Sequence, residues 1–323
     1  MTETKPTVLV TRRMPAAVLD QLAQSCTVDV HPGTDDLTHD ILCERVRSKD
    51  GLICMFNDSI DAAVIAAADS LRVIATVAVG FDNIDVEAAT AGGIVVTNTP
   101  DILTGATAEL TWALILSVTR RVGEADRVVR RGGWTGWTFD FMLGSELRDK
   151  QLGIIGGGRI GRAVAAIAPA FGMRPVFAAK PGARRDVASE DGDTVLSLDE
   201  LLLTSDVVSL HLPLTDGTRH LINRRTLARM KRSACLINTS RGPIVDEEAL
   251  SWALEERLIA GAGLDVFEDE PHVHAGLQQR ENVCLTPHIG SATRETRAAM
   301  AGLAVTNVVD VLSGRPALTP VNG

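Results

Sequence analysis

The chain has 323 residues, which suits two ordinary domains better than one. Hydrophobic residues make up 45% and charged residues 23%, and these globular values argue against collagen, coiled coil and global disorder. The formal net charge is -9, so there is no basic excess for a nucleic-acid surface or an anionic membrane. A small anionic ligand is still compatible, because a few local cations and helix N-termini can hold it.

Compartment signals indicate a cytoplasmic protein. The sequence lacks an apolar stretch of transmembrane length, and its N-terminus lacks the basic, apolar and small-residue order of a signal peptide. The cysteines are odd in number and scattered, so we expect buried reduced thiols rather than disulfides or metal ligands. They are Cys26, Cys43, Cys54, Cys235 and Cys284. Aromatic residues are only 3%, which leaves few stacking platforms for single-stranded nucleic acid.

Short apolar runs alternate with amphipathic stretches of helical length in the first hundred residues. Strands are expected over residues 7–10, 51–56, 73–76 and 94–97, and helices over 16–23 and 61–68. Strands that are apolar throughout are typical of parallel sheets buried on both faces. The alternation therefore predicts an α/β sheet with right-handed crossovers.

The pattern changes after Pro100. Residues 106–118 are apolar and helical, and we expect the same helix to continue through two arginines toward Arg130. An irregular Gly/Trp loop containing Trp134 and Trp137 follows. Exposed tryptophans are costly unless they pack, either on a partner subunit or on the body of the same chain.

A second alternating series begins at Leu152. Six strands are expected over residues 152–155, 176–179, 207–210, 235–238, 260–264 and 283–285. With helices between them, these strands fit one doubly wound domain. The last predicted helix, over 292–312, would return to the first domain, so that the chain crosses twice between two similar folds.

A glycine motif follows the first strand of this second series. Gly156-x-Gly158-x-x-Gly161 lies between that strand and the start of a helix. Gly156 allows a tight turn, Gly158 lets a pyrophosphate approach the backbone, and Gly161 allows the helix to pack closely on the strand. The helix N-terminus adds N–H donors and a partial positive charge. In this context the motif predicts dinucleotide binding rather than a simple glycine turn.

The end of the next strand indicates which dinucleotide binds. An acid there would hold the ribose 2′-hydroxyl of NAD, but the sequence has Ala179 followed by Lys180, Arg184 and Arg185. Cations attract a 2′-phosphate, which an acid would repel. The sequence therefore favours NADPH, with NADH as the weaker cofactor. A basic turn that contacts only solvent is the other interpretation, and the cation that holds the phosphate stays open.

Three later strand ends carry polar side chains suited to chemistry. They are Arg241, Glu270 and His288, and the carboxyl ends of parallel strands border the ligand crevice in open α/β sheets. His288 can protonate a carbonyl oxygen, Glu270 can hold its imidazole, and Arg241 can grip a carboxylate with two hydrogen bonds. Each residue alone has a structural explanation, whereas the three together fit carbonyl reduction.

Several longer segments share features with a known family. They are residues 79–85, 98–100, 103–109, 152–161, 238–246, 264–271 and 286–293. Together they resemble the D-isomer-specific 2-hydroxyacid dehydrogenase family almost from end to end. Residues 133–137 followed by 142–144 are similar to its glyoxylate and hydroxypyruvate reductase branch.

The resemblance implies two Rossmann-like, doubly wound parallel-sheet domains with the active site in the cleft between them. Residues 1–99 with 291–323 would bind substrate, and residues 100–290 would bind the dinucleotide. The family is usually dimeric through the cofactor domains, so a homodimer is expected, which fits the loop with Trp134 and Trp137.

The resemblance also implies residue roles. His288 would be the general acid, Glu270 its partner, and Arg241 a group that binds and polarises the substrate. Main-chain N–H groups of Val79 and Gly80 would bind the substrate carboxylate, and Met55 is a candidate wall residue with core packing as its alternative. The expected cofactor contacts are Gly156, Gly158, Arg159, Ile160, Gly161, Lys180, Arg184, Arg185, Thr107, His211, Pro213, Thr239 and Asp265, with Asp265 at the nicotinamide carboxamide.

These features predict NADPH-dependent reduction of a small 2-oxoacid, glyoxylate or hydroxypyruvate, to a D-2-hydroxy acid without a metal. A reductase of a larger oxoacid such as 2-ketogluconate is the alternative within the class. A nucleotide-sensing binding module on the same fold is the alternative of another class. Arg241, Glu270 and His288 count against that module, because a binder needs no proton donor.

Overall fold

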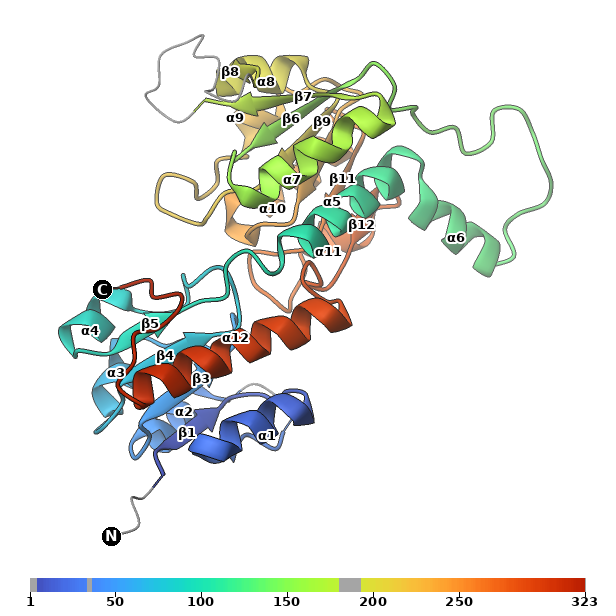
Figure 1. Cartoon of the computed structure of the whole chain (residues 1–323). Coiled ribbons are helices and arrows are strands. Elements are labelled where there is room, and N and C mark those ends of the chain that lie inside the picture. Colours follow the sequence, from blue (N-terminus) through green and yellow to red (C-terminus); the bar gives the residue numbers. More distant parts are fainter. Residues whose placement is uncertain (1–4, 34–36, 180–192, 323) are drawn as a thin grey trace. The chain divides into compact units, whose positions relative to one another are not determined.

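The computed structural model describes residues 5–33, 37–179 and 193–322 (Figure 1). The chain divides into two compact units. Unit 1 comprises Met1–Leu103 and Ser291–Gly323, and unit 2 comprises Thr104–Gly290. The first division coincides with the start of a helix at Thr104, slightly beyond the boundary that the sequence suggested after residue 99.

Unit 1 is built on a parallel sheet of five strands in the order β2-β1-β3-β4-β5. Their bounds are β1 (Thr7–Val10), β2 (Thr27–Val30), β3 (Gly51–Cys54), β4 (Val73–Thr76) and β5 (Val95–Thr97). Successive side chains of a strand point to opposite faces of the sheet. Val8 and Val10 accordingly join the core on one face, and Leu9 joins the core on the other.

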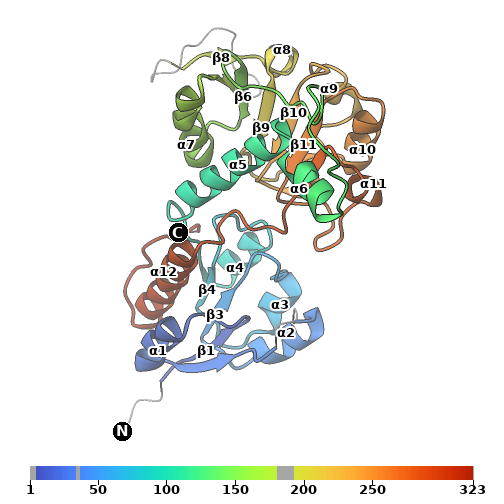
Figure 2. The same ribbon diagram turned by 90° about the vertical axis from the view of Figure 1, so that its right-hand side faces the viewer.

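Helices cover both faces of this sheet (Figure 2). One face carries α1 (Ala16–Ser25) and α12 (Arg294–Leu312), and the other carries α2 (His39–Val46), α3 (Ala62–Ala67) and α4 (Val86–Ala91). Ala304 and Val308 of α12 are fully buried in the same core as Ile53 and Val73. The end of the chain thus completes the core of the N-terminal segment, as the sequence suggested for this helix.

Unit 2 is built on a parallel sheet of seven strands in the order β12-β11-β10-β9-β6-β7-β8. Their bounds are β6 (Gln151–Ile155), β7 (Arg174–Ala178), β8 (Val195–Leu196), β9 (Val207–Leu210), β10 (Cys235–Asn238), β11 (Gly261–Leu264) and β12 (Val283–Leu285). One face packs on α5 (Thr104–Thr119) and α7 (Arg159–Ile167). The other packs on α8 (Leu198–Thr204), α9 (Arg224–Leu227), α10 (Glu247–Glu255) and α11 (Ala275–Gln278). Two 3-10 turns, η1 (Ala168–Phe171) and η2 (Gly242–Ile244), complete the unit.

In both sheets the order in which strands are added reverses at the first strand, so that later strands lie on both sides of it. In unit 1, β1 lies between β2 and β3, and in unit 2, β6 lies between β7 and β9. At such a switch point the connections leave the two neighbouring strand ends in opposite directions, and ligands of open α/β sheets bind there. The glycine motif follows β6 directly, so the fold places it at the switch point of unit 2.

The prediction of one continuous helix as far as residue 130 is wrong. The structure has two helices, α5 and then α6 (Val122–Arg130), with Arg121 between them at a φ of 55°. A residue in the left-handed region cannot continue a right-handed helix. The Arg121 guanidinium instead pairs with Glu124 in the first turn of α6, at 2.7 Å. Residues 131–150 then form no helix or strand, and in Figure 1 their first part runs away from the sheet of unit 2.

The prediction from the sequence also omitted some elements. β2, α2, α4 and β8 were not predicted, and β8 makes the second sheet seven-stranded rather than six-stranded. β2 is a partly exposed edge strand, and β8 has only two residues, so neither shows a strong apolar run. All five cysteines are free thiols, but Cys43 and Cys284 are only partly buried, which corrects the expectation of five buried thiols. Within the described residues, no helix is both long and apolar enough to cross a membrane.

Candidate active site

The glycine turn after β6 is shaped by backbone contacts that only glycine permits. Gly156 has a φ of 109°, and a Cβ there would lie 2.3 Å from the carbonyl oxygen of His211. A Cβ on Gly161 would lie 2.1 Å from the carbonyl oxygen of Gly156. By contrast, a Cβ on Gly158 would meet no atom within 4 Å. The first and third glycines therefore close the turn, and the second leaves open space beside it.

That open space lies at the N-terminus of α7. Gly158 is the N-cap of this helix, and no side chain caps it. Arg159 and Ile160 begin the helix, and α7 is held on α5 by a hydrogen bond from Trp112 Nε1 to the Val164 carbonyl, at 3.1 Å. Uncapped N–H groups at a helix N-terminus attract phosphate oxygens. The turn therefore fits the pyrophosphate of a dinucleotide.

His211 follows β9 on the other side of the switch point. Its N–H donates to the Ile155 carbonyl at 2.8 Å, and its Nε2 lies 2.8 Å from Ser209 Oγ. Burial lowers the pKa of His211 to about 3, so the imidazole is neutral at physiological pH. The contribution of His211 to the turn is thus its backbone carbonyl against Gly156. Pro213, two residues on, accepts a hydrogen bond from Thr218.

The residues expected to select the cofactor lie only partly within the described structure. Ala179 follows β7, and its N–H donates to the Leu196 carbonyl at 2.8 Å. This strand end carries no carboxylate at that position. Lys180, Arg184 and Arg185 lie outside the described residues.

His288 and Glu270 form a close pair at the carboxyl edge of the unit 2 sheet. His288 Nδ1 lies 2.8 Å from Glu270 Oε2, and both side chains are about a quarter exposed, at 23% and 26%. The other carboxylate oxygen, Oε1, accepts the Phe267 N–H at 3.0 Å. A carboxylate on Nδ1 fixes the orientation of the ring, so Nε2 is the nitrogen that can transfer a proton to a ligand.

Asp265 holds the turn that carries His288, a role that the sequence did not reveal. It is 1% exposed, and its oxygens accept hydrogen bonds from Thr286 Oγ1 at 2.7 Å and from the N–H groups of Ile289 and Gly290 at 2.8 Å. Burial raises the pKa of Asp265, and these hydrogen bonds oppose the rise. His288 itself has a φ of 50°, and its N–H donates to the Asp265 carbonyl at 2.8 Å.

Arg241 lies on the neighbouring loop, after β10. Asn238 holds this loop, since its Nδ2 donates to the Arg241 carbonyl at 2.9 Å while its Oδ1 accepts from Ser240. Arg241 Nη1 donates to the Ser240 carbonyl at 2.8 Å. Strands β10, β11 and β12 are adjacent and parallel, so their ends bring the loops with Arg241, Glu270 and His288 to one edge.

Two threonines expected near the cofactor lie at the same edge. Thr107 Oγ1 donates to the Gly290 carbonyl at 3.3 Å, next to the His288 turn. Thr239 Oγ1 lies 3.0 Å from Thr111 Oγ1 and is nearly buried. In the described structure these hydroxyls tie α5 to the strand ends, and their contact with a cofactor stays a prediction.

The residues expected to contact substrate from the N-terminal part belong to unit 1. Met55 follows β3, and its N–H donates to Asp58 Oδ2 at 2.8 Å. Val79 and Gly80 follow β4, and the Val79 carbonyl accepts a hydrogen bond from Asn98 Nδ2 at 2.8 Å. All three lie at the carboxyl edge of the unit 1 sheet, and their binding roles stay predictions.

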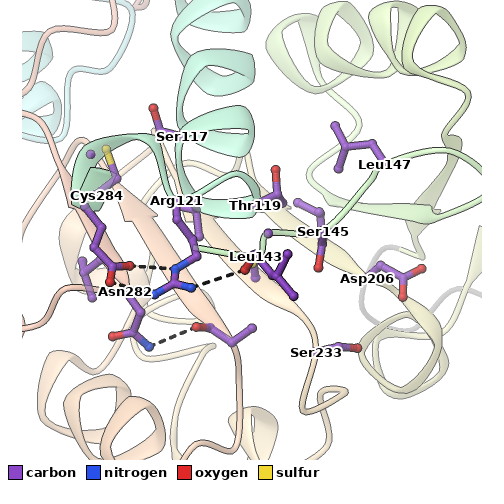
Figure 3. Close-up of a pocket in the computed structure, with 18 of the residues that line it drawn as sticks. Ser117, Thr119, Arg121, Leu143, Ser145, Leu147, Asp206, Ser233, Asn282 and Cys284 are labelled. Carbon is purple, nitrogen blue, oxygen red and sulfur yellow. Dashed lines mark hydrogen bonds and ion pairs between the residues drawn. The ribbon is translucent and has the colours of Figure 1, made fainter. Parts of the chain in front are cut away.

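A pocket of about 180 Å³ lies at the opposite, amino edge of the unit 2 sheet (Figure 3). Its lining includes Ser117, Thr119, Ser145, Ser233 and Cys284. An ion pair between Arg121 and Glu124 crosses it, and Arg121 also donates to the Leu143 carbonyl. The pocket contains none of the predicted site residues, so it is separate from the edge that carries the glycine turn.

The glycine turn at the switch point of a parallel sheet defines unit 2 as a dinucleotide-binding domain. Comparison with known proteins agrees. Residues 112–290 match the family model described as D-isomer specific 2-hydroxyacid dehydrogenase, NAD binding domain. A glyoxylate reductase of Aeropyrum pernix is 49% identical over 316 residues, which cover 96% of this chain and 94% of that protein.

Solved structures resemble the chain over nearly its full length. The TT0316 protein of Thermus thermophilus superposes with a TM-score of 0.91 at 48% identity, covering 98% of this chain and 99% of that one. The NADPH-dependent glyoxylate/hydroxypyruvate reductase of Sinorhizobium meliloti, in complex with NADP and malonate, gives 0.85 at 35% identity, covering 98% and 97%. The chain therefore belongs to the D-isomer-specific 2-hydroxyacid dehydrogenase family, in its glyoxylate reductase branch.

Proposed function

We propose that the protein reduces a small 2-oxoacid, glyoxylate or hydroxypyruvate, with NADPH. The product is the 2-hydroxy acid, of D configuration where its second carbon is chiral. The observation that carries this proposal is the 2.8 Å contact of His288 Nδ1 with Glu270 Oε2, at the sheet edge that also carries the glycine turn. An oriented imidazole is the group that carbonyl reduction needs as its proton donor.

Each residue has a separate task in this reaction. The chemistry that a nicotinamide cofactor supplies when bound is a hydride for the carbonyl carbon. Arg241 binds the substrate carboxylate and polarises the carbonyl, because a guanidinium presents paired donors to planar anions. His288 gives the proton on Nε2 to the carbonyl oxygen as negative charge develops there. Glu270 stabilises the resulting arrangement by keeping Nδ1 protonated and the ring in one orientation.

The cofactor proposal depends on the end of β7. Ala179 replaces the acid that would bind the 2′-hydroxyl of NAD, and the three cations that follow it suit a 2′-phosphate. The Sinorhizobium meliloti relative is named as NADPH-dependent, which supports the same preference. NADH is expected to serve as the weaker cofactor.

Steady-state turnover with a cofactor and substrate panel tests the proposal. Purified protein would be given NADPH or NADH against glyoxylate, hydroxypyruvate, pyruvate and 2-ketogluconate. We expect the highest kcat/KM for NADPH with glyoxylate or hydroxypyruvate. A preference for 2-ketogluconate would replace the substrate assignment, whereas NADPH binding without turnover on any substrate would favour a nucleotide-sensing module.

A single substitution tests the proposed preference for NADPH over NADH. Ala179→Asp places a carboxylate at the end of β7, where it repels a 2′-phosphate and accepts from a 2′-hydroxyl. We expect the NADPH to NADH ratio of kcat/KM to fall by at least about tenfold, or about 1.4 kcal/mol. Ala179→Asn, which adds the same bulk as aspartate without its charge, is the control. An unchanged ratio in the Asp variant would mean that the phosphate is held elsewhere.

We also propose a cytoplasmic homodimer. Trp134 is 59% exposed, Trp137 is 79% exposed and Val129 of α6 is 59% exposed, and such a run of apolar surface suits a partner subunit. Light scattering of the purified protein should give twice the chain mass. A monomer at micromolar concentration would contradict this part of the proposal.

A further inference from the structure

Glu247 is a buried acid that has no part in the proposed reaction. It is the first residue of α10, it follows the Arg241 turn closely in sequence, and it is only 5% exposed. Removing a carboxylate from water costs free energy unless hydrogen bonds satisfy its oxygens. The partners of Glu247 therefore show what this buried charge holds in place.

Those partners lie on the loop that carries Glu270. Glu247 Oε1 accepts the Glu268 N–H at 2.9 Å, and Oε2 accepts the His274 N–H at 3.3 Å. In return, Glu268 Oε2 accepts the Glu247 N–H at 3.1 Å. Each glutamate thus holds the backbone of the other, and His220 Nε2 holds the remaining Glu268 oxygen, Oε1, at 2.5 Å.

The Arg241 turn packs on the same loop from a second direction. A Cβ on Gly242 would lie 1.9 Å from both the carbonyl carbon and the carbonyl oxygen of Phe267. No side chain fits between these two backbones, so glycine allows their direct contact. The turn after β10 and the loop after β11 are therefore fixed to each other twice, by packing at Gly242 and by hydrogen bonds at Glu247.

The chain of contacts continues to the proton donor. The Phe267 N–H donates to Glu270 Oε1 at 3.0 Å, and Glu270 Oε2 meets His288 Nδ1 at 2.8 Å. Phe267 and Glu268 are thus the residues that connect the buried acid to the Glu270–His288 pair.

We propose that Glu247 is a positioning residue for the Glu270–His288 pair, acting through the backbone of the loop from Phe267 to Glu270. The role of His288 as proton donor, on which this inference rests, is that of the proposed function. Glu247 also keeps the Arg241 turn in register with this loop, because it begins the helix that follows the turn. Its own side-chain hydrogen bonds in the described structure go to the backbone N–H groups of Glu268 and His274.

Glu247 and Glu268, each of which accepts the backbone N–H of the other, form what we call the Glu247–Glu268 clamp. Several titratable side chains lie around it. Glu247 faces the Glu268 carboxylate and His274, Glu268 faces His220, and His288 faces Glu270 and Asp265. Burial raises the pKa of Glu247, while the N–H groups of Glu268 and His274 oppose that rise. The clamp therefore depends on hydrogen-bond geometry more than on a favourable ion pair.

Glu247→Gln tests the role with little change of shape. The amide keeps one acceptor oxygen but turns an NH2 group toward a backbone donor, so one of the two loop contacts is lost. Because a looser Glu270 stabilises imidazolium less, the alkaline limb of the pH–rate profile should move to lower pH by at least about 0.5 unit. We expect kcat to fall at least about tenfold, with the Kd for NADPH within about twofold of wild type.

Asp206→Asn is the matched control. Asp206 is a partly buried carboxylate that likewise accepts a backbone hydrogen bond, from the Gln151 N–H at 2.9 Å, and it accepts the Lys231 ammonium at 3.0 Å, but at the amino edge of the same sheet. This variant should lower the melting temperature while leaving the pH–rate profile in place. If Glu247→Gln lowers the melting temperature and also keeps the wild-type profile, Glu247 is structural only and the inference is wrong.

Two additions keep the test decisive. Should Glu247→Gln fail to fold, Glu268→Gln disturbs the other half of the clamp from a more exposed position and is expected to shift the profile in the same direction. The pH titration of the His288 ring by NMR, assigned with His288→Asn, does not need turnover. A shift of that titration in Glu247→Gln supports the positioning role even if no substrate turns over, and no shift overturns it even in an active enzyme.

Discussion

The two sheets of the molecule share a parallel topology, but the residues at their switch points differ in charge and size. In unit 1, the ends of β1 and β3 are joined by Asp58, which is 3% exposed. Its Oδ2 accepts from Thr11 Oγ1 at 2.5 Å, and its Oδ1 lies 3.5 Å from Arg12 Nη1. In unit 2, the ends of β6 and β9 are in direct backbone contact, because Gly156 packs against the carbonyl of His211 with no side chain between them.

The two turns differ in how they interact with an anion. A buried carboxylate at the switch point repels phosphate oxygens. A glycine turn with an uncapped helix N-terminus attracts them. Both units share this arrangement of strands around the first strand, and the glycine turn of unit 2 is the feature that suits a dinucleotide.

Breaking the glycine turn should give the largest effect. Gly156→Ala forces a Cβ against the His211 carbonyl at a backbone conformation with a φ of 109°. We expect the free energy of unfolding to fall by about 3 kcal/mol or more and dinucleotide binding to be lost. Urea denaturation and NADPH fluorescence titration measure the two effects.

Gly158→Ala separates binding from folding at the same turn. The added Cβ meets no protein atom within 4 Å, so stability should stay near wild type while dinucleotide affinity falls at least about tenfold. Wild-type affinity in this variant would show that the pyrophosphate does not lie at the N-terminus of α7.

Removing the charge at the other switch point should spare the cofactor. Asp58→Asn weakens the contacts with Thr11, Arg12 and the Met55 N–H, and we expect a loss of about 2 kcal/mol in the free energy of unfolding. The Kd for NADPH should be unchanged, because unit 2 alone carries the dinucleotide turn. A clear loss of NADPH affinity would undermine the contrast between the units.

His211 should make stability depend on acid. The pKa of His211 is about 3 in the folded protein against an ordinary 6.5, so between these values the unfolded chain binds more protons and acid favours unfolding. From pH 7 to pH 5 this group should cost the folded state up to about 2 kcal/mol. His211→Asn should lose that much less stability over the same range in urea denaturation. Parallel curves for variant and wild type would mean that His211 keeps its ordinary pKa of about 6.5 in the folded protein.

Local patterns predicted the parts of this structure that depend on neighbouring residues in the chain. The apolar strands, the glycine turn and the final helix were read directly from the sequence. The Arg121 break was missed because its cause, a left-handed residue paired with Glu124, is not a property of helix periodicity. The edge strand β2 and the two-residue β8 have too little apolar pattern to be seen.

The residues of the candidate active site also fall into those that local sequence predicts and those that only tertiary contacts reveal. Arg241, Glu270 and His288 stand at strand ends in recognisable segments, so their types and positions could be anticipated. The Glu247–Glu268 clamp joins the start of α10 to the loop after β11 through backbone N–H donors. No spacing rule for acidic residues in a sequence indicates such a pair. Asp265 was anticipated as a cofactor contact, but its hydrogen bonds to the His288 turn join residues that are more than 20 positions apart in the chain, so no local pattern indicates them.

The most direct test of the account is turnover by a His288→Asn variant. NADPH oxidation with glyoxylate or hydroxypyruvate would be followed beside His272→Asn, a control on the Glu270 loop whose side chain is 80% exposed. The account predicts that His288→Asn loses at least about a hundredfold in kcat, while NADPH binding and the control stay near wild type. Turnover within about tenfold of wild type would contradict the assignment of His288 as the proton donor.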